Sequence, residues 1–404
     1  LMFEPGAPGL ALDVNAARAL IASVLYQPHL ASRQVDLPLE PVVRGDLDDL
    51  QAAIVNYLVS RGIPYNTTTS VISIAVRDLD SGMETGLNEQ VLHSATSTAK
   101  IGVLATYFRY IYEEPNAEMR FRLAAAIICS SNVDANLTMA IAGNGNSAAG
   151  IGNVNTTFCQ AGATNTLINR NFFIGPAGEG AVPQDYYDPA GVTPCQSGDT
   201  ASLDGTLSPD VDPDLQTTAA DMSQFLAMIY HCAEKGAGLA ERFPGEFTQT
   251  ECQWMLEILR GTRFLHLAEL GIPEGVSFAH KVGYGGEALG DAGIVFSPGG
   301  DYTLVIYIWD EEMDSLDTYA LSRWNIVSEI SRLIYNYFNP DAPLLTPRLP
   351  PNAFGGAACV LPNWPEATIN LNNINAGRFD ASGDPLPGAC YDWPACRPFS
   401  GWEQ

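Results

Sequence analysis

The chain has 404 residues, 46% of them hydrophobic, and no apolar run reaches the roughly 18 residues that a membrane span requires, so we expect a globular protein without membrane insertion. A formal net charge of −26, without any local cluster of Lys or Arg, would repel phosphate backbones and excludes nucleic acid as a partner. The length allows two or three domains, or one large domain with extensions.

The cysteine pattern bears on the compartment. None of the eight cysteines belongs to a C-x-x-C pair or to a Cys/His cluster with zinc-like spacing. Cys159 and Cys195 bracket a stretch rich in Gly, Pro and Asp, and Cys390 and Cys396 lie in a polar tail. Cysteines in such loop-like sequence indicate disulfides, so we predict an extracytoplasmic protein, whether secreted, periplasmic or wall-associated. Cys129, in an apolar run, is expected to be a buried thiol or half of a core bridge.

Residues 1–45 are predicted to form a small appendage. Residues 14–25 have a helix-like pattern, and an extended segment punctuated by proline follows at 35–41. The segment resembles the closing part of a wall-associated repeat that occurs beside transpeptidase-like domains. We therefore interpret it as the end of such a repeat.

A regular pattern of helices and strands begins at residue 46. In chain order it predicts an amphipathic helix, a strand, a tight turn, a second strand and two apolar helices, at 47–61, 71–76, 80–82, near Gln90, 97–112 and 117–129. The dense Ala, Leu and Ile content of the last two helices indicates a buried helical layer.

Residues 143–216 are rich in Gly, Asn, Asp, Pro and Thr, and they are predicted to be a long loop region that shapes a site. Helices, strands and a final helix follow at 217–235, 247–260, 293–296, 303–309 and 319–337. Strands at both ends with helices between them indicate the α/β (α+β) class, with an antiparallel sheet flanked by helices and an all-helical subdomain inserted. This domain is expected to span 46–340. The Pro- and Asn-rich residues 341–404 are interpreted as an extension pinned by disulfides.

Ser97 and Lys100 form the first candidate catalytic pair. A spacing of three residues at a helix start places both side chains on one face. Serine is a weak nucleophile unless a neighbouring base takes its proton, and a partly desolvated lysine can do so. The alternative is an N-cap serine followed by a solvated lysine.

The scarcity of lysine favours the catalytic interpretation. The chain has 17 arginines but only three lysines, at 100, 235 and 281. Arginine keeps its proton, whereas lysine can shift its pKa and act as a base, so a lysine in an arginine-rich chain indicates proton transfer. The alternative is that the three lysines occur there by chance.

Two further segments contain candidate site residues. In Ser130-Ser131-Asn132, a hydroxyl could relay a proton and an amide could bind a substrate amide, although such a segment is also a common loop or cap. In His280-Lys281-Val282-Gly283-Tyr284, a lysine beside a glycine-rich edge could hold a carboxylate while backbone N–H groups stabilise an oxyanion. The alternative is an ordinary glycine-rich hairpin turn.

The three segments, taken in order, resemble the motifs S-x-x-K, S-D-N and K-T-G of the serine β-lactamase and penicillin-binding protein superfamily, and they look closest to its class A β-lactamase branch. The resemblance implies that Ser97 is the acylated nucleophile, Lys100 its base and Ser130 the proton donor to the leaving amine. It also implies that Asn132 contacts the acyl side chain and that Lys281 attracts a substrate carboxylate. By the same resemblance, Gly283 and Tyr284 would complete the substrate-binding edge, and the N–H groups of Ser97 and Tyr284 would form the oxyanion hole.

The chain departs from these motifs at three places. Ser131 replaces the family's aspartate, and Val282 replaces the hydroxyl residue that would bond a carboxylate. The Glu-x-x-Leu-Asn segment that activates the deacylating water is missing. Glu179 is the only glutamate between Asn132 and Thr217, and Asp185 and Asp188 are weaker substitutes. Efficient β-lactam turnover is therefore not expected.

Two hypotheses follow. The first is a serine hydrolase that forms an acyl-enzyme on Ser97 and acts on a β-lactam, a peptidoglycan peptide or another small acyl substrate. No metal or organic cofactor is implied. The alternative is a catalytically inactive protein of the same fold that binds or scaffolds the cell wall. A third hypothesis is an unrelated α/β protein in which these motifs occur by chance.

Overall fold

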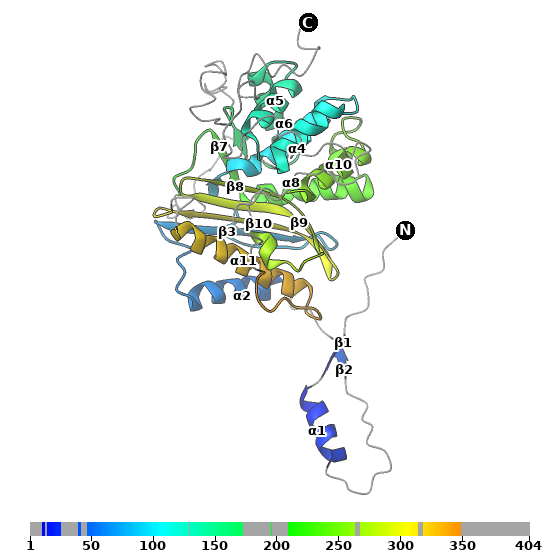
Figure 1. Ribbon diagram of the computed structural model, residues 1–404, viewed down its shortest axis with the longest axis vertical. Coiled ribbons are helices and arrows are strands. Elements are labelled where there is room, and N and C mark those ends of the chain that lie inside the picture. Colours follow the sequence, from blue (N-terminus) through cyan, green and yellow to red (C-terminus); the bar gives the residue numbers. More distant parts are fainter. Residues whose placement is uncertain are drawn as a thin grey trace, which may run out of the picture.

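The computed structural model has a five-stranded antiparallel sheet at its centre, with helices on both faces (Figure 1). It describes residues 10–12, 14–25, 39–41, 47–128, 130–172, 195, 209–262, 267–313 and 318–348. The strand order across the sheet is β4 (Glu84–Leu87), β3 (Ser70–Asp78), β10 (Gly300–Asp310), β9 (Ala288–Ser297) and β8 (Ser277–Gly285). The predicted fold class, a sheet built from both ends of the domain and covered by helices, is confirmed.

The central strands β3 and β10 are buried on both faces, which explains why their sequences are almost continuously apolar. They pair antiparallel, with Ile74 opposite Ile306. These two side chains point towards helices α2 (Leu47–Ser60) and α11 (Thr318–Phe338), while Ala75 and Val305 point into the larger cluster on the other face.

The larger cluster lies among the helices of the opposite layer (Figure 1). These helices are α3 (Lys100–Tyr110), α4 (Ala117–Ile128), α5 (Asn132–Ala142), α6 (Ser147–Gln160), α8 (Ala219–Lys235), α9 (Gly238–Arg242) and α10 (Gln249–Arg260). A small sheet of β5 (Leu92–Ser94), β7 (Leu215–Thr218) and β6 (Leu167–Ile168) adjoins them. No helix within the described residues is long and apolar enough to cross a membrane.

The prediction of a loop throughout residues 143–216 is wrong in its described parts. Helix α6 occupies Ser147–Gln160, and β6 and β7 lie in the same interval. The Asn146 side chain caps α6, and Ile151, Val154 and Phe158 bury one face of it. A Cβ at Gly150 would meet the carbonyl of Met139, so the glycine allows α5 and α6 to approach closely. The glycines and asparagines that suggested a loop therefore include packing and capping positions.

Smaller differences occur near the predicted strand ends. Instead of one strand near Gln90, two short strands, β4 and β5, lie on either side of it. The helix expected from Ser97 begins as a 3-10 helix, η1 (Thr96–Ala99), and continues as α3. In the appendage, α1 (Val14–Leu25) was predicted, whereas the pairing of β1 (Leu10–Leu12) with β2 (Leu39–Pro41) was not.

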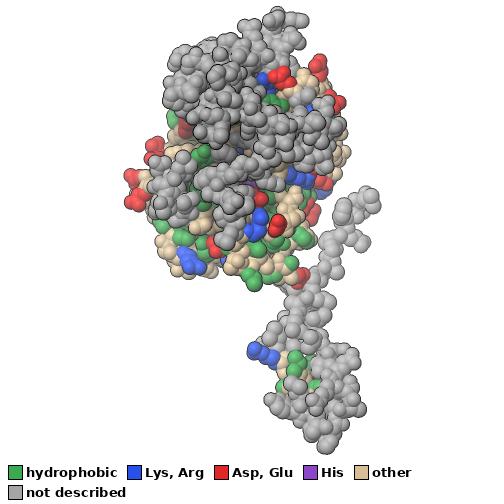
Figure 2. Space-filling model, in the orientation of Figure 1, with side chains coloured by type: hydrophobic (Ala, Val, Ile, Leu, Met, Phe, Trp, Pro, Cys, Tyr) green, Lys and Arg blue, Asp and Glu red, His purple; other side chains and the backbone are tan. Residues whose placement is uncertain are grey.

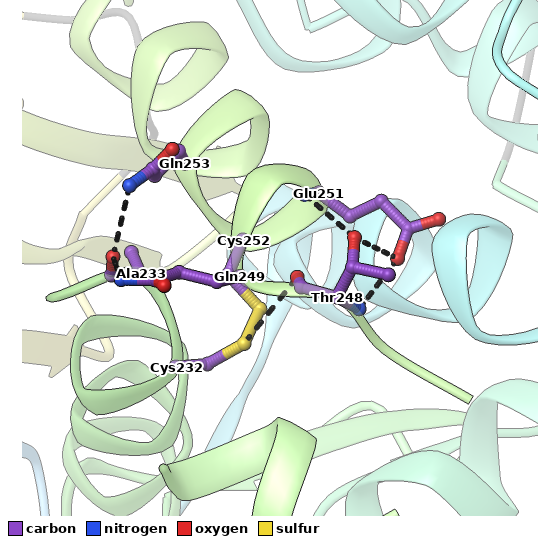
Figure 3. Close-up of a disulfide and its surroundings, with 7 residues drawn as sticks. All are labelled: Cys232, Ala233, Thr248, Gln249, Glu251, Cys252 and Gln253. Carbon is purple, nitrogen blue, oxygen red and sulfur yellow. Dashed lines mark hydrogen bonds between the residues drawn. A yellow bond between two sulfur atoms is a disulfide. The ribbon is translucent and has the colours of Figure 1, made fainter. Parts of the chain in front are cut away.

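Two disulfides lie within the described residues. Cys159 at the end of α6 bonds Cys195, and both cysteines were predicted to form disulfides. Cys232 in α8 bonds Cys252 in α10, with 5.8 Å between their Cα atoms (Figure 3). No local pattern indicates that these two cysteines pair. Cys129 and the cysteines of the tail, at 359, 390 and 396, lie outside the described residues.

Capping and side-chain hydrogen bonds reinforce the contact between α8 and α10. The Thr248 and Glu251 side chains form a capping box at the start of α10. Gln249 and Gln253 donate to the carbonyl of Ala233 near the end of α8 (Figure 3).

On the face of the molecule shown in Figure 2, acidic side chains lie along the edges of the domain, as the strongly negative charge leads one to expect.

Candidate active site

Ser97 lies in the 3-10 turn η1, between strand β5 and helix α3. Thr96 adopts a left-handed φ of 48°, which lets the chain turn sharply before Ser97. The Thr98 hydroxyl donates to the carbonyl of Ala95 and lies 2.7 Å from the hydroxyl of Tyr307 on β10. The turn is therefore held from the sheet side, and Ser97 and Lys100 face the same direction one turn apart.

The edge strand β8 lies directly against this turn. A Cβ at Gly283 would collide with Thr96 Oγ1 and would lie 2.8 Å from Ser97 N and 3.0 Å from Thr98 N. Only glycine permits this approach without moving one of the two elements. The close contact brings the end of β8 to the nucleophile.

Lys100 is completely buried, and its Nζ has four acceptors nearby. Nζ lies within hydrogen-bonding distance of Ser97 Oγ (3.1 Å), Ser130 O (2.6 Å), Ser130 Oγ (3.2 Å) and Asn132 Oδ1 (2.5 Å). An ammonium has only three protons, whereas a neutral amine has two and a lone pair. The two shortest contacts suit two N–H donors, which leaves the lone pair free to accept the Ser97 proton.

The surroundings of Lys100 favour this neutral form. Burial lowers its pKa well below the usual lysine value, the nearby charge of Lys281 lowers it further, and Asp134 partly offsets both effects. The Phe172 ring lies 4.9 Å from Nζ, and the Asn136 amide fixes the backbone of Phe172 through two hydrogen bonds of 2.8 Å. An aromatic ring thus covers one side of the amine.

Ser130 lies between the two buried lysines. Its Oγ accepts at 2.9 Å from Nζ of Lys281, which also donates to the carbonyl of Val282, and it lies 3.2 Å from Nζ of Lys100. Burial lowers the pKa of Lys281 to about 7, although Asp291 raises it. Because a lone pair of Ser130 Oγ accepts from Lys281, the Ser130 hydroxyl proton can be donated to a substrate.

Alternation along β8 separates the side chains of the third motif. Val282 packs in the core cluster beneath α2 and α11, so residue 282 presents an apolar side chain to the interior. The carbonyls of His280 and Val282 accept bonds from Thr262 and Lys281 and so point off the free edge of the sheet. Since alternate residues in a strand share this orientation, the N–H of Tyr284 also points off that edge, beside η1.

The structure thus brings together the predicted residues Ser97, Lys100, Ser130, Asn132 and Lys281, from η1, α3, the start of α5 and β8. Gly283 and Tyr284 lie at the adjoining strand edge. The predicted deacylation acid Glu179, with Asp185 and Asp188, lies outside the described residues.

Two site residues were missed from the sequence. Asp134 follows Ser131 by three residues, a spacing typical of a helix N-terminus that could have identified it. Phe172 had no such signal, because it ends an irregular stretch and is placed by the distant Asn136.

The beta-lactamase enzyme family model matches residues 118–338. Among solved structures, PBP-A is 20% identical with a TM-score of 0.50, covering 73% of this chain and 97% of that one. The β-lactamase from Sphaerobacter thermophilus DSM 20745 is 15% identical with a TM-score of 0.50, covering 74% and 100%. A variant of the last common ancestor of Gram-negative bacteria class A β-lactamase is 16% identical, with a TM-score of 0.50 and coverage of 73% and 100%. These likenesses concern the fold. No curated protein sequence matches the chain.

Proposed function

Because the chain belongs to the beta-lactamase enzyme family, we propose that it is a serine hydrolase that is acylated on Ser97. The observation that carries this proposal is the 3.1 Å contact between Ser97 Oγ and the buried Nζ of Lys100. Burial lowers the pKa of Lys100 well below the ordinary lysine value, which favours the neutral amine that can accept the serine proton.

In the proposed acylation, Ser97 Oγ attacks the substrate carbonyl carbon while its proton passes to Lys100. The N–H groups of Ser97 and Tyr284 stabilise the oxyanion. The bond to the leaving group then breaks as Ser130 donates its proton to the leaving nitrogen or oxygen, and Lys100 returns a proton to Ser130. Asn132 is available to the acyl side chain, and Lys281 supplies positive charge to attract a carboxylate.

We infer that the acyl-enzyme is hydrolysed slowly. Deacylation requires a group that activates water. The side chain of Phe172, which lies beside the Lys100 amine, is an aromatic ring and cannot do so. Val282 offers no hydroxyl to a substrate carboxylate. These features favour penicillin-binding behaviour or hydrolysis of an ester or a wall peptide over rapid β-lactam turnover. Glu179 remains the proposed source of any deacylating carboxylate.

The compartment and domain limits belong to the same proposal. Two disulfides and the family fit a protein outside the cytoplasm, acting on a small acyl compound or a peptidoglycan peptide. We propose that residues 46–340 form the catalytic domain, with 1–45 and 341–404 as appendage and extension. Limited proteolysis should release the first and last segments before it cuts the domain.

The function is tested by incubating the protein with a fluorescent penicillin and with an activated ester, followed by intact mass measurement. We expect a long-lived adduct that is absent in Ser97→Ala and in Lys100→Met. Lys235 is exposed at the end of α8, so Lys235→Met is the matched lysine control and should be labelled normally. Turnover without accumulation would show efficient deacylation. No adduct and no turnover with either probe would favour the wall-binding scaffold instead.

A further inference from the structure

Asp134, in the first turn of α5, is bonded to the residue that replaces the aspartate of the second motif. Its Oδ2 accepts from Ser131 Oγ at 2.6 Å, and its backbone N–H donates to the same hydroxyl at 3.2 Å. Ser131 is the N-cap of α5 and separates Ser130 from Asn132, both of which contact Lys100. A single hydrogen bond thus connects the carboxylate of Asp134 to residues 130–132, the segment that contacts the proposed base.

This segment needs external support, because Ser130 has a left-handed φ of 56°, a strained conformation for a residue other than glycine. The Ser131 N–H donates to the carbonyl of Ala125 on α4 at 2.9 Å, and the Ser131 side chain is held by Asp134. Both contacts fix the chain immediately after the strained residue.

Asp134 is itself held by a buried arginine. Its Oδ1 accepts from Arg122 on α4 at 2.9 Å, and both side chains are almost completely buried. Arg122 also pairs with Glu118, which is 38% exposed. Two carboxylates therefore face one guanidinium. Separating the Arg122–Asp134 pair would leave a buried charge without a partner, which is costly. The pair therefore holds α4 and α5 together on either side of Ser130.

We propose that Asp134 is a positioning residue of the active site, which holds Ser131 so that Ser130 and Asn132 stay within hydrogen-bonding reach of Lys100. The inference rests on the proposed acylation of Ser97. The supporting carboxylate comes from Asp134, three residues after Ser131, through the bond from Ser131 Oγ.

A second effect of Asp134 is electrostatic. The charged groups that act on Lys100 are Lys281 from β8, which lowers its pKa, and Asp134 from α5, which raises it. Removing the charge of Asp134 should therefore lower the pKa of Lys100 further. The acid limb of the acylation rate against pH would move to lower pH, an effect that a purely structural role would not produce.

The test compares Asp134→Asn and Ser131→Ala with the control Glu118→Gln, which removes the other carboxylate on Arg122. The rate of Ser97 labelling by fluorescent penicillin is measured across pH. Because the chain has only three lysines, Cε-labelled lysine also gives an NMR titration in which Lys100 can be assigned and followed without substrate. Thermal unfolding identifies any variant that does not fold.

We expect Asp134→Asn to label about tenfold more slowly or worse, as loss of a buried charged hydrogen bond usually does, and its Lys100 titration to move to lower pH. Ser131→Ala should label slowly with a smaller titration shift, because the Asp134 charge remains. If Asp134→Asn fails to fold, the labelling rate of Ser131→Ala still tests whether the bond between Ser131 and Asp134 positions the site. Glu118→Gln should resemble the wild type.

Wild-type rates and titrations in folded Asp134→Asn and Ser131→Ala would overturn the inference, as would equal losses in Glu118→Gln. If the wild type itself is never labelled on Ser97, the proposed function fails. The Lys100 titration still decides in that case whether Asp134 acts on the buried amine.

Discussion

The missing side chain at residue 283 lets β8 lie against the turn that carries Ser97. We predict that Gly283→Ala will fold but will be acylated at least about 100-fold more slowly, since displacement of a nucleophile by about 1 Å has effects of that size. The added Cβ would collide with Thr96 and approach the backbone N of Ser97 to 2.8 Å, so η1 or β8 must move. Stability should fall by about 1–3 kcal/mol, as overpacking usually causes. Acylation rates and denaturant unfolding measure both effects.

Gly285 provides the matched control two residues further along the same strand. A Cβ there would meet only Thr96 Cγ2, at an ordinary distance of 4.0 Å. Gly285→Ala should therefore label at nearly the wild-type rate. Equal losses in both variants would mean that the close approach at residue 283 is not the cause.

The Phe172 ring lies 4.9 Å from Nζ of Lys100, so a charged side chain at residue 172 would lie close to the proposed base. We predict that Phe172→Glu shortens the lifetime of the acyl-enzyme, because a carboxylate near the Lys100 amine could activate water. The same charge should raise the pKa of Lys100 and slow acylation near neutral pH. The measurements are time-resolved intact mass after excess penicillin is removed, and the acylation rate. Phe172→Leu, which adds no charge, should keep the long lifetime, and an unchanged lifetime in Phe172→Glu would contradict the prediction.

At the scale of elements, the Cys232–Cys252 disulfide joins α8 to α10 across a separation of 20 residues. Replacing both cysteines by alanine should lower the free energy of unfolding by about 3 kcal/mol, the size expected for a loop of this length. The capping box and the two glutamines that bond Ala233 remain, so the helices should still pack and Ser97 should still be labelled. Denaturant unfolding of the oxidised wild type and the double variant measures the difference, and equal stabilities would contradict it.

The sequence was informative for elements whose local pattern agrees with their burial. The helices α8, α10 and α11 and the strands β9 and β10 have strong periodicity or long apolar runs, and they lie close to where they were expected. Helix α6 was missed because Gly150, Gly152 and Asn153 dilute its apolar face, although Gly150 serves the contact with α5. Local patterns do not show which glycines are packing positions.

For the candidate site, too, local patterns predict only the contacts between residues that are close in sequence. Ser97 and Lys100 are close in sequence, so a helical turn was enough to place them together. The bond between Lys281 and Ser130 spans 151 residues and depends on the sheet edge reaching the helical layer. Phe172 reaches Lys100 only because Asn136 binds its backbone. Such contacts arise from tertiary packing, and only the resemblance to a family anticipated the first of them.

At the scale of the whole molecule, two of the three lysines are buried in a protein whose net charge is −26. Lys100 and Lys281 are both completely buried, and burial is the largest cause of the lowered pKa of each, with Lys281 at about 7 compared with an ordinary 10.5. Folding therefore releases protons from both lysines when the solution pH lies between the folded and unfolded pKa values. The stability of the protein must depend on pH in that window.

The sign of that dependence follows from proton counting. Between pH 7.5 and 9.5 the unfolded chain keeps Lys281 protonated while the folded protein does not, so the free energy of unfolding should rise with pH by at most about 1.4 kcal/mol per pH unit. The lowered pKa of Lys100 acts in the same direction. His93, with its pKa lowered to about 3 by burial, acts only below this window, and the tyrosines whose pKa is raised by burial act only above it. Urea unfolding at constant ionic strength should show the rise in the wild type and in Lys235→Met, with a smaller slope in Lys281→Met. A wild-type stability that stays flat or falls across the window would mean that the two amines keep their protons inside the fold, and neither could then act as a neutral base.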